Sequence, residues 1–202
     1  MSIARLRDFV GELTDIVRDG ARETVILDDL RAPMSRLLAH DDWLPDAFAA
    51  PHPEHYQQYL LHCDPKQRFS VVSFVWGPGQ KTPIHDHTVW GMIGMLRGGE
   101  ESTRFKTRGA VMPMLAGESC VLDVGDIDCV SPTAGDVHRV RNLYDDRVSI
   151  SIHVYGANIG RVQRHVYDEA TGSVKAFVSG FSSTVIPNLW MLTDDERRSA
   201  VA

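Results

Sequence analysis

The chain has 202 residues, of which 43% are hydrophobic and 24% are charged, and this composition is typical of a globular protein. Its length predicts a single domain spanning residues 1–202. The formal net charge of −6 argues against a nucleic-acid partner and against an anionic membrane surface, because both repel an acidic protein. These two classes of partner are therefore not expected.

The N-terminus lacks the uninterrupted apolar run of a signal peptide, and the chain nowhere holds about 18 consecutive apolar residues. We therefore expect a soluble cytoplasmic protein. Cys63, Cys120 and Cys129 are odd in number and lack C-x-x-C spacing, so neither a disulfide framework nor a zinc knuckle is indicated. We expect these cysteines to be buried or half-buried. The sequence predicts no oligomeric state.

Helical periodicity characterises residues 1–50. Between Ser2 and Asp19 apolar residues recur at intervals of three and four, with Ser2 as the predicted N-cap and Gly20 as the end of the helix. A second helix is predicted over Asp29–His40, and a short third helix over Trp43–Phe48. We expect this helical part to pack on whatever follows it.

Short strand-like segments separated by glycine and proline follow over residues 56–180 and indicate a β-sandwich or barrel. They are predicted at Tyr56–Leu61, Phe69–Trp76, Val89–Leu96, Glu101–Lys106, Glu118–Leu122, Arg139–Asn142, Val148–Tyr155 and Arg164–Tyr167, with a last pair closing around Thr171–Gly172. The predicted fold class is therefore mainly β, a jelly-roll-like barrel with N-terminal α-helices packed on it.

Three histidines are candidate metal ligands. His85 and His87 are two residues apart, so in an extended strand their imidazoles point to the same face and converge. An H-x-H pair alone is equally typical of surface or core histidines without a ligand role. His138, which follows Gly135 and precedes Asn142, supplies the third candidate ligand.

The spacing of these residues resembles the two sequence motifs of the cupin superfamily, small β-barrels that hold a metal inside. The glutamate that usually follows H-x-H in the first motif is absent, since Gly91 or Met92 stands there. Three neutral imidazoles would then form the ligand set, which suits Fe, Zn, Cu and Ni. A divalent ion that keeps its full charge favours an anionic ligand such as a substrate thiolate, and three open positions leave room for O₂.

The segment Val148–Tyr155 alternates strictly between apolar and polar side chains. A polar row of this kind lies against solvent in most sheets, so by itself it fits either an ordinary outer face or the wall of a polar cavity. The proposed metal favours the cavity. The polar row consists of Ser149, Ser151, His153 and Tyr155.

Together, the segment Pro83–Thr88, His138 and the pattern Ser151-x-His153-x-Tyr155 resemble the thiol dioxygenases of the cysteine dioxygenase type. These are non-haem iron cupins that convert a thiol and O₂ into a sulfinic acid, and the similarity runs from about Tyr56 to Tyr167. The resemblance implies Fe(II) as the cofactor. It also implies that the metal ligands are His85, His87 and His138, and that Ser151, His153 and Tyr155 form a hydrogen-bonded triad whose tyrosine hydroxyl points at the iron.

Two departures from the animal cysteine dioxygenases bear on the substrate. Gly91 stands where those enzymes carry a cysteine that crosslinks to the tyrosine, so no crosslink to Tyr155 is expected. Gln58 stands where they carry a carboxylate-binding arginine. Both departures are similar to bacterial 3-mercaptopropionate dioxygenases, in which a later arginine, matched here by Arg164, is proposed to meet the carboxylate. Taken by themselves, Arg164 fits a surface ion pair with Asp168 or Glu169 equally well, and Gln58 fits a solvated position.

We therefore expect a non-haem Fe(II)-dependent thiol dioxygenase that oxidises 3-mercaptopropionate with O₂ to 3-sulfinopropionate. Oxidation of L-cysteine to cysteine sulfinate is the alternative, and cysteamine is a more distant one because it lacks a carboxylate. A non-redox metal-binding cupin, either isomerase-like or a sensor, is an alternative from another functional class.

Several residues near these motifs are expected to have structural roles. Asp86 and Asn142 are expected to orient loops or neighbouring groups, and Trp90 is expected to belong to the core. The histidines to which no ligand role is assigned are His40, His52, His55, His62 and His165.

Overall fold

The structure is a computed structural model that describes residues 3–18, 20–106, 115–182, 196, 198 and 199. Two α-helices, α1 (Ala4–Ile16) and α2 (Glu23–Leu38), precede a short 3₁₀ helix, η1 (Asp46–Phe48). The strands are β1 (Gln57–Cys63), β2 (Ser70–Trp76), β3 (Ile84–His85), β4 (Gly91–Arg97), β5 (Gly99–Lys106), β6 (Leu115–Asp123), β7 (Ile127–Val130), β8 (His138–Asn142), β9 (Ser149–Tyr155), β10 (Arg164–Tyr167) and β11 (Val174–Phe177), with a 3₁₀ helix η2 (Ile159–Arg161) before β10. None of the described helices is long and apolar enough to cross a membrane.

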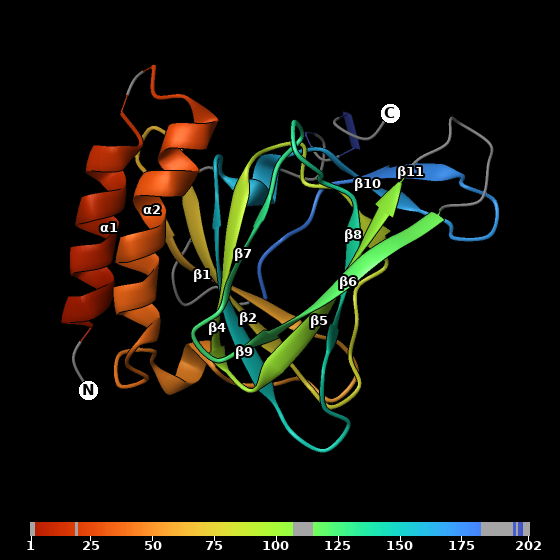
Figure 1. Ribbon diagram of the computed structural model, residues 1–202, viewed down its shortest axis with the longest axis horizontal. Helices are drawn as coiled ribbons and strands as arrows, with labels where there is room; N and C mark the ends of the chain where they lie inside the picture. The colour runs from red at the N-terminus through yellow and green to blue at the C-terminus, as the bar shows by residue number, and fades with distance from the viewer. Residues whose placement is uncertain (1–2, 19, 107–114, 183–195, 197, 200–202) are drawn as a thin grey trace.

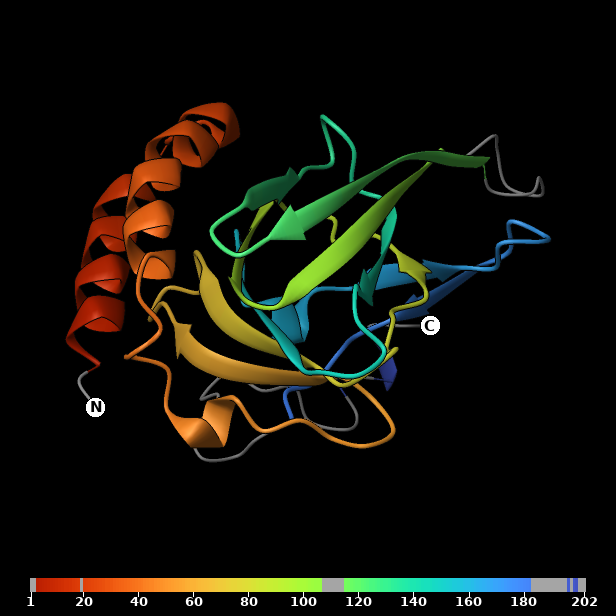
Figure 2. The same cartoon turned by 60° about the horizontal axis from the view of Figure 1, so that its bottom comes forward.

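The strands form two sheets whose inner faces share a core. One sheet has the order β1-β2-β9-β4-β7 and the other the order β11-β10-β3-β8-β5-β6. Val140 from the second sheet packs in one buried cluster with Phe74 and Trp76 from the first, and the views in Figures 1 and 2 show the sheets curving around a common interior. The prediction of a mainly β, cupin-like barrel is therefore confirmed.

Helix α2 packs against the outer face of the β1-β2-β9-β4-β7 sheet, and α1 lies beside α2 on the side away from the strands (Figure 1). Leu13 of α1 and Leu30 and Met34 of α2 are fully buried in the same cluster as Ile150 and Ile152 of β9. Each such side chain contributes about 2 kcal/mol relative to an exposed position. The helices therefore pack on the barrel and cover the outer face of this sheet, as predicted.

Two helix predictions need correction. Helix α2 begins at Glu23 and not at Asp29, because buried Ile26 extends the apolar stripe of Leu30 one turn towards the N-terminus. The third helix is only the 3₁₀ turn η1, because the residue before Pro45 is disfavoured in the α conformation. The predicted N-cap Ser2 lies outside the described residues, and α1 ends at Ile16, before Gly20 takes a positive φ of 79° in the connection.

The strand predictions hold with small shifts at the ends, and the hairpin of β10 and β11 closes where it was predicted, with Gly172 at a φ of 70°. Two short strands were missed, β3 and β7. Strand β3 has only two residues, and β7 (Ile-Asp-Cys-Val) has too few β-branched or aromatic residues to stand out as a strand. Cys63 and Cys129 are half-buried as expected, whereas Cys120 is exposed, because it lies on β6, an edge strand of its sheet.

Strand β9 is buried on both faces. Its apolar residues, including Ile150, Ile152 and Val154, join the cluster under the helices. The alternation then turns Ser151, His153 and Tyr155 to the opposite face, the barrel interior. An ordinary solvated outer face is thereby excluded for this polar row.

A buried ion pair ties the turn between β1 and β2 to helix α1. Asp64 is 2% exposed and accepts hydrogen bonds from the Arg68 guanidinium, at 2.9 Å from Nε and 2.7 Å from Nη2. It also accepts from the backbone N–H groups of Lys66 and Arg68, at 2.9 and 3.1 Å. Arg68 Nη1 in turn donates to the carbonyl of Val17, just after α1, at 2.7 Å. The Arg68 hydrogen bonds are the main reason that the pKa of Asp64 is lowered to about 2.

We expect Asp64→Asn to lower the free energy of unfolding at neutral pH by about 2 kcal/mol. Because the folded-state pKa is depressed, this stabilisation is complete above the pKa of the unfolded carboxyl, about 4, and is lost as pH falls towards 2. Urea unfolding at neutral and at acidic pH should therefore show the gap between wild type and variant closing in acid. Asp146→Asn, at an exposed pair with Arg147, is the control with little effect. A gap that is the same at every pH would contradict the assignment.

Candidate metal centre and substrate pocket

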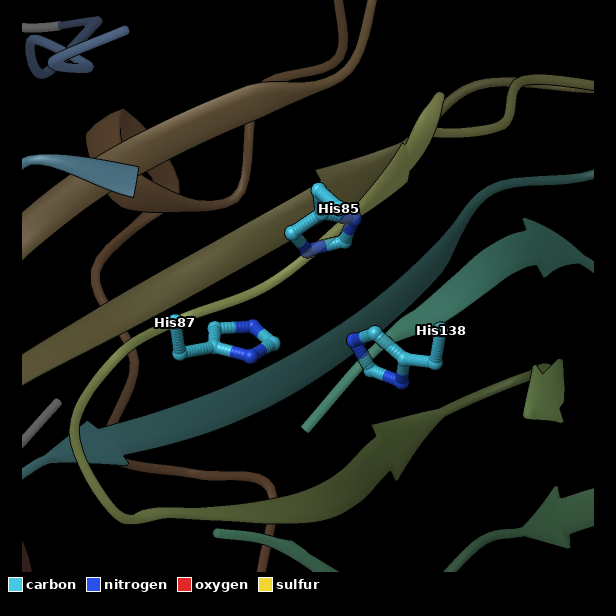
Figure 3. A group of neighbouring side chains, drawn as sticks. All are labelled: His85, His87 and His138. Atoms are coloured by element: carbon cyan, nitrogen blue, oxygen red, sulfur yellow. The ribbon is translucent and has the colours of Figure 1, made fainter. Parts of the chain in front are cut away.

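Three buried histidines converge inside the barrel (Figure 3). His85 ends β3 and His138 begins β8, where the two residues are direct cross-strand partners. His87 follows β3 in the loop to β4, so the strand alternation used to predict the pair does not extend to it. The ligand nitrogen atoms of the three rings nevertheless lie within 4.8 Å of one another.

Each of the three rings is held through its Nδ1 atom. His85 Nδ1 lies 3.1 Å from the Pro83 carbonyl oxygen, and His138 Nδ1 lies 3.1 Å from Ser102 Oγ. His87 Nδ1 lies 2.9 Å from Asp136 Oδ1. When Nδ1 carries the proton, a neutral imidazole presents the lone pair of Nε2 to a metal. The Pro83 carbonyl and the Asp136 carboxylate are acceptors that favour this tautomer in His85 and His87, and the Ser102 hydroxyl orients the ring of His138.

Asp136 also holds the loop that carries His87. Its carboxylate accepts the backbone N–H of His87, at 3.0 Å from each oxygen, and that of Thr88 at 2.8 Å. Thr88 has a φ of 58°, which is unusual for a β-branched residue. The Asp136 carboxylate therefore helps to keep His87 in place at a strained turn.

Burial keeps the three imidazoles neutral. It lowers the pKa of His85 to about 4, with the Arg164 charge adding to the effect. Burial, followed by the neighbouring imidazoles, also holds the pKa values of His87 and His138 well below the ordinary value. A cluster of neutral nitrogen ligands fits a divalent transition metal.

Ser151, His153 and Tyr155 form a hydrogen-bonded chain beside this cluster. Ser151 Oγ lies 2.9 Å from His153 Nε2, and His153 Nδ1 lies 2.9 Å from the Tyr155 hydroxyl. The Tyr155 ring stacks on the ring of His87, with centroids 5.5 Å apart. Burial raises the pKa of Tyr155, so its hydroxyl keeps its proton at neutral pH.

Gly91 faces the ring of Tyr155 across the pair of β4 and β9. A Cβ atom at this position would lie 3.1 Å from Tyr155 Cδ1 and 2.9 Å from Val130 Cγ2. Residue 91 therefore adjoins the tyrosine, as the resemblance to the animal cysteine dioxygenases implied. Because it is a glycine, it has no sulfur atom to crosslink with Tyr155.

Arg164 is buried, and the surface ion pair considered from the sequence does not form. Its side chain is 3% exposed, with Cζ 4.7 Å from the centroid of the Phe177 ring and Nη2 donating to Ser179 Oγ. Asp168 instead accepts from Thr171 at 2.8 Å, and Glu169 pairs with Arg139 at 2.7 Å.

The guanidinium of Arg164 opens on a cavity of about 210 Å³ that reaches the histidine cluster. Its Nε has no hydrogen-bond partner among the described residues. Burial lowers the pKa of Arg164, but a guanidinium, with its ordinary pKa above about 12, remains charged. The residues that line the cavity are Tyr56, Gln58, Phe74, Thr82, Pro83, His85, Arg164, Val166 and Phe177.

The sequence thus pointed to residues from five separate segments that the fold brings to one place. Gln58 is half-buried and lines the cavity with Arg164 and His85, which differs from a fully solvated position. Tyr56, which also lines it, was not singled out, because a lone tyrosine before a strand carries no signal of its own.

Asp86, Asn142 and Trp90 have the structural roles expected of them. Asp86 Oδ2 lies 2.8 Å from both His165 Nδ1 and the Tyr167 hydroxyl. The Asn142 amide donates to the carbonyls of Gly77 and Arg147, each at 2.9 Å. Trp90 belongs to the core.

A second group of possible ligands, His52, Glu54 and His55, lies at the surface. The rings of His52 and His55 have centroids 3.9 Å apart. Glu54 and His55 are exposed, and groups of this kind are common without an ion. These residues provide a useful control for the buried cluster.

The comparison with known proteins agrees with this geometry. The sequence model of a family described as cysteine dioxygenase type I matches residues 4–170. The chain belongs to the cysteine dioxygenase type I family. This confirms the resemblance at the level of the family, while the narrower likeness to bacterial 3-mercaptopropionate dioxygenases stays a prediction.

Individual proteins resemble this chain at low sequence identity. Cysteine dioxygenase type 1 from Bos taurus is 25% identical over 118 residues, which are 57% of this chain and 58% of that protein. A protein with a double-stranded β-helix domain from Klebsiella pneumoniae has a TM-score of 0.48 and 19% identity, covering 64% of this chain and 99% of its own. An RmlC-like cupin protein from Desulfovibrio desulfuricans has a TM-score of 0.43 and 19% identity, covering 58% and 95%.

We expect Asp136→Asn to weaken metal binding about 10- to 100-fold, because the amide is a poorer partner for His87 Nδ1. His85→Ala should abolish tight binding. Titration of metal-free protein with Fe(II) or Co(II) against a competing chelator measures both effects. The double variant His52→Ala/His55→Ala should bind like wild type, and a loss there with an unchanged Asp136→Asn would place the metal at the surface group instead.

Proposed function

We propose that this protein is a non-haem Fe(II)-dependent thiol dioxygenase that oxidises 3-mercaptopropionate with O₂ to 3-sulfinopropionate. The observation that carries the proposal is the position of Arg164. Its buried guanidinium, with an unpartnered Nε, opens on the same cavity as His85 of the histidine cluster. A short molecule with a carboxylate at one end and a thiol at the other could place the carboxylate at Arg164 and the thiol at the histidine cluster.

The three histidines fit Fe(II) as the metal. Their Nε2 atoms are free of the partners that hold Nδ1, and among the described residues the group of possible ligands contains no carboxylate. A bound Fe(II) would supply Lewis acidity towards the thiol and the redox chemistry that O₂ requires. Zinc lacks that redox chemistry, so the membership of a dioxygenase family favours iron.

The reaction is balanced by its two substrates. Both atoms of O₂ become bonded to the thiol sulfur, the O–O bond breaks, and the thiol proton passes to the sulfinic acid or to water. The O₂ oxidises the sulfur and is itself reduced, so no further reductant is needed. The residues of the chain therefore act by binding, orienting and hydrogen bonding.

Arg164 would hold the substrate carboxylate. Its Nη2 already donates to Ser179 and its face packs on Phe177, so the fork is fixed before substrate arrives. A carboxylate bound there relieves the unsatisfied Nε and forms charge-assisted hydrogen bonds. Gln58 lines the same cavity and can donate an amide N–H to a carboxylate oxygen.

Tyr155 would act as a hydrogen-bond donor to the reacting sulfur or oxygen. Its hydroxyl is positioned by His153 at 2.9 Å, and His153 by Ser151 at 2.9 Å. The ring of His153 is itself clamped against Phe74, with centroids 4.0 Å apart. A preorganised donor in a buried site stabilises charge that develops during the reaction without costly rearrangement.

The lining of the cavity favours 3-mercaptopropionate over L-cysteine, the alternative that the name of the family supports. None of the described residues that line it is a carboxylic acid, so the ammonium group of cysteine would be buried without an acidic partner. Cysteamine lacks the carboxylate that Arg164 would bind. 3-Mercaptopropionate has no ammonium group to bury, and its carboxylate would be paired with Arg164.

O₂ consumption by Fe(II)-loaded protein, with sulfinate identified by mass, tests the proposal against 3-mercaptopropionate, L-cysteine and cysteamine. We expect 3-mercaptopropionate to have the highest kcat/KM. Arg164→Ala should lower that kcat/KM about 100-fold, equivalent to about 3 kcal/mol, mainly through KM and with iron retained. Arg139→Ala, which breaks the surface pair with Glu169, should change neither constant.

The outcomes separate the alternatives. Preference for L-cysteine would keep the dioxygenase and overturn the substrate. A zinc-filled protein that consumes no O₂ with any of these thiols would support the non-redox cupin. Unchanged kinetics in Arg164→Ala would remove the carboxylate role from this residue.

We expect Tyr155→Phe to retain iron but to turn over about 10- to 100-fold more slowly, or to consume O₂ without a matching yield of sulfinate, because the donor is lost. The ratio of sulfinate formed to O₂ consumed measures the coupling. Tyr59→Phe, which loses only a hydrogen bond to the Ala50 carbonyl, is the control. Wild-type rate and coupling in Tyr155→Phe would contradict the assigned role.

A further inference from the structure

Glu100 is a buried carboxyl group for which the mechanism above has no role. It lies on β5, is 1% exposed, and its Oε2 has no hydrogen-bond partner among the described residues. Its carboxyl group interacts with the Ser151 hydroxyl. Glu100 therefore meets the chain of Ser151, His153 and Tyr155 at the end away from the tyrosine.

The Ser151 hydroxyl has one proton and two lone pairs, and three groups compete for them. Trp76 Nε1 lies 3.1 Å from Ser151 Oγ and, as an indole N–H, only donates. One lone pair and the single proton remain for His153 Nε2 and Glu100. One of these two groups must donate to Ser151 and the other must accept from it.

The protonation of Glu100 therefore selects one of two arrangements. A carboxylate accepts the Ser151 proton, so that His153 donates through Nε2–H and its Nδ1 accepts the proton of Tyr155. A carboxylic acid has no acceptor for its proton among the described residues other than Ser151 and donates to it, so that Ser151 donates to His153 Nε2 and Nδ1–H donates to the Tyr155 oxygen. Only the second arrangement leaves the Tyr155 proton free to point at a substrate.

The surroundings favour the carboxylic acid. A buried carboxylate with one oxygen unpartnered carries a large desolvation cost, which protonation removes. Burial raises the pKa of Glu100 to about 7, while the hydrogen bond from Ser151 opposes the shift and the charge of Asp128 adds to it. The carboxylic acid is therefore the major form below about pH 7. Burial also lowers the pKa of His153 to about 3, so the imidazole is neutral and the two arrangements are the relevant ones.

The titratable groups that surround Glu100 lie on neighbouring strands: Cys120 on β6, Asp128 on β7, and His153 and Tyr155 on β9. Asp128 is itself paired with Arg104, at 2.8 Å from each carboxylate oxygen. On β8, the residue opposite Glu100 is Asn142, which carries no charge. No cationic side chain is paired with the Glu100 carboxyl among the described residues.

We infer that Glu100 is a positioning residue which, as a carboxylic acid, sets the direction of the hydrogen bonds through Ser151 and His153 so that the Tyr155 hydroxyl donates into the site. This role rests on the proposed dioxygenase function, in which Tyr155 is the donor. Loss of the Glu100 proton reverses the chain and turns the Tyr155 hydroxyl away from substrate.

The tautomer of His153 tests this inference in metal-free protein, without any measurement of activity. Imidazole ¹⁵N shifts distinguish Nδ1–H from Nε2–H, and His153→Gln identifies the signals. We expect Nδ1–H about one pH unit below 7 and Nε2–H about one unit above it, as Glu100 ionises. In Glu100→Gln the side chain no longer ionises, so the tautomer of His153 should be the same at both pH values.

The matched control is Glu101→Gln, since Glu101 pairs with Arg141 on the outside of the same strand at 2.6 Å. This variant should switch tautomer as wild type does. In the infrared spectrum, the C=O band of a protonated carboxyl should be present in wild type and in Glu101→Gln and missing from Glu100→Gln.

An Nε2–H tautomer in wild type at the lower pH would overturn the inference, as would an unchanged pH switch in Glu100→Gln. The wild-type measurement decides the question even if the variant fails to fold. Absence of O₂ uptake with every thiol would contradict the proposed function and leave the tautomer result standing, so the two failures are distinguishable.

Discussion

The interior of this barrel is organised by the cost of burying polar groups without partners. Four imidazoles, a guanidinium and a carboxyl group are all removed from water here, and each would destabilise the fold if it were left unpaired. Within the described part of the chain, two buried side-chain atoms lack a partner, Arg164 Nε and Glu100 Oε2. Arg164 lines the cavity and the Glu100 carboxyl group interacts with Ser151 of the hydrogen-bonded chain, so these two residues mark two sides of the candidate site.

The outer face of the same sheet decides which way the polar residues point. Helices α1 and α2 bury Ile150, Ile152 and Val154, and this burial holds β9 in a single orientation. The alternation of the strand then directs Ser151, His153 and Tyr155 inwards. The N-terminal helices therefore contribute to the site without touching it, since a bare sheet would have no apolar reason to keep its polar row inside.

The site could be predicted in part because several of its residues are close in sequence. His85 and His87 lie two positions apart, and Ser151, His153 and Tyr155 follow one another at strand spacing, so local periodicity was informative. Local periodicity could not show whether the polar row faces solvent or the interior, because the alternation is the same for a solvated face and a cavity wall. Arg164 likewise fitted a surface ion pair until its burial was known.

Glu100 shows why the remaining part could not be read from the chain. In sequence it is one of two adjacent glutamates, and nothing local distinguishes it from Glu101. The pleat of β5 sends one side chain inwards to Ser151 and the other outwards to Arg141. Strand β3 was similarly hidden, because it forms by pairing with the distant strands β8 and β10. The loop of His87 was hidden because its backbone N–H groups donate to Asp136, which lies in a distant segment.

The sequence by itself determined the mainly β class, the N-terminal helices, the family and the chemical types of the residues that gather in the barrel. These properties follow from periodicity and from motifs whose members are near one another in the chain. Tertiary structure alone decided which face of β9 is internal, that Arg164 is buried beside the histidines, and that Glu100 meets Ser151. Each of these depends on contacts between segments far apart in sequence, where burial changes the charge a residue carries and the partners it can reach.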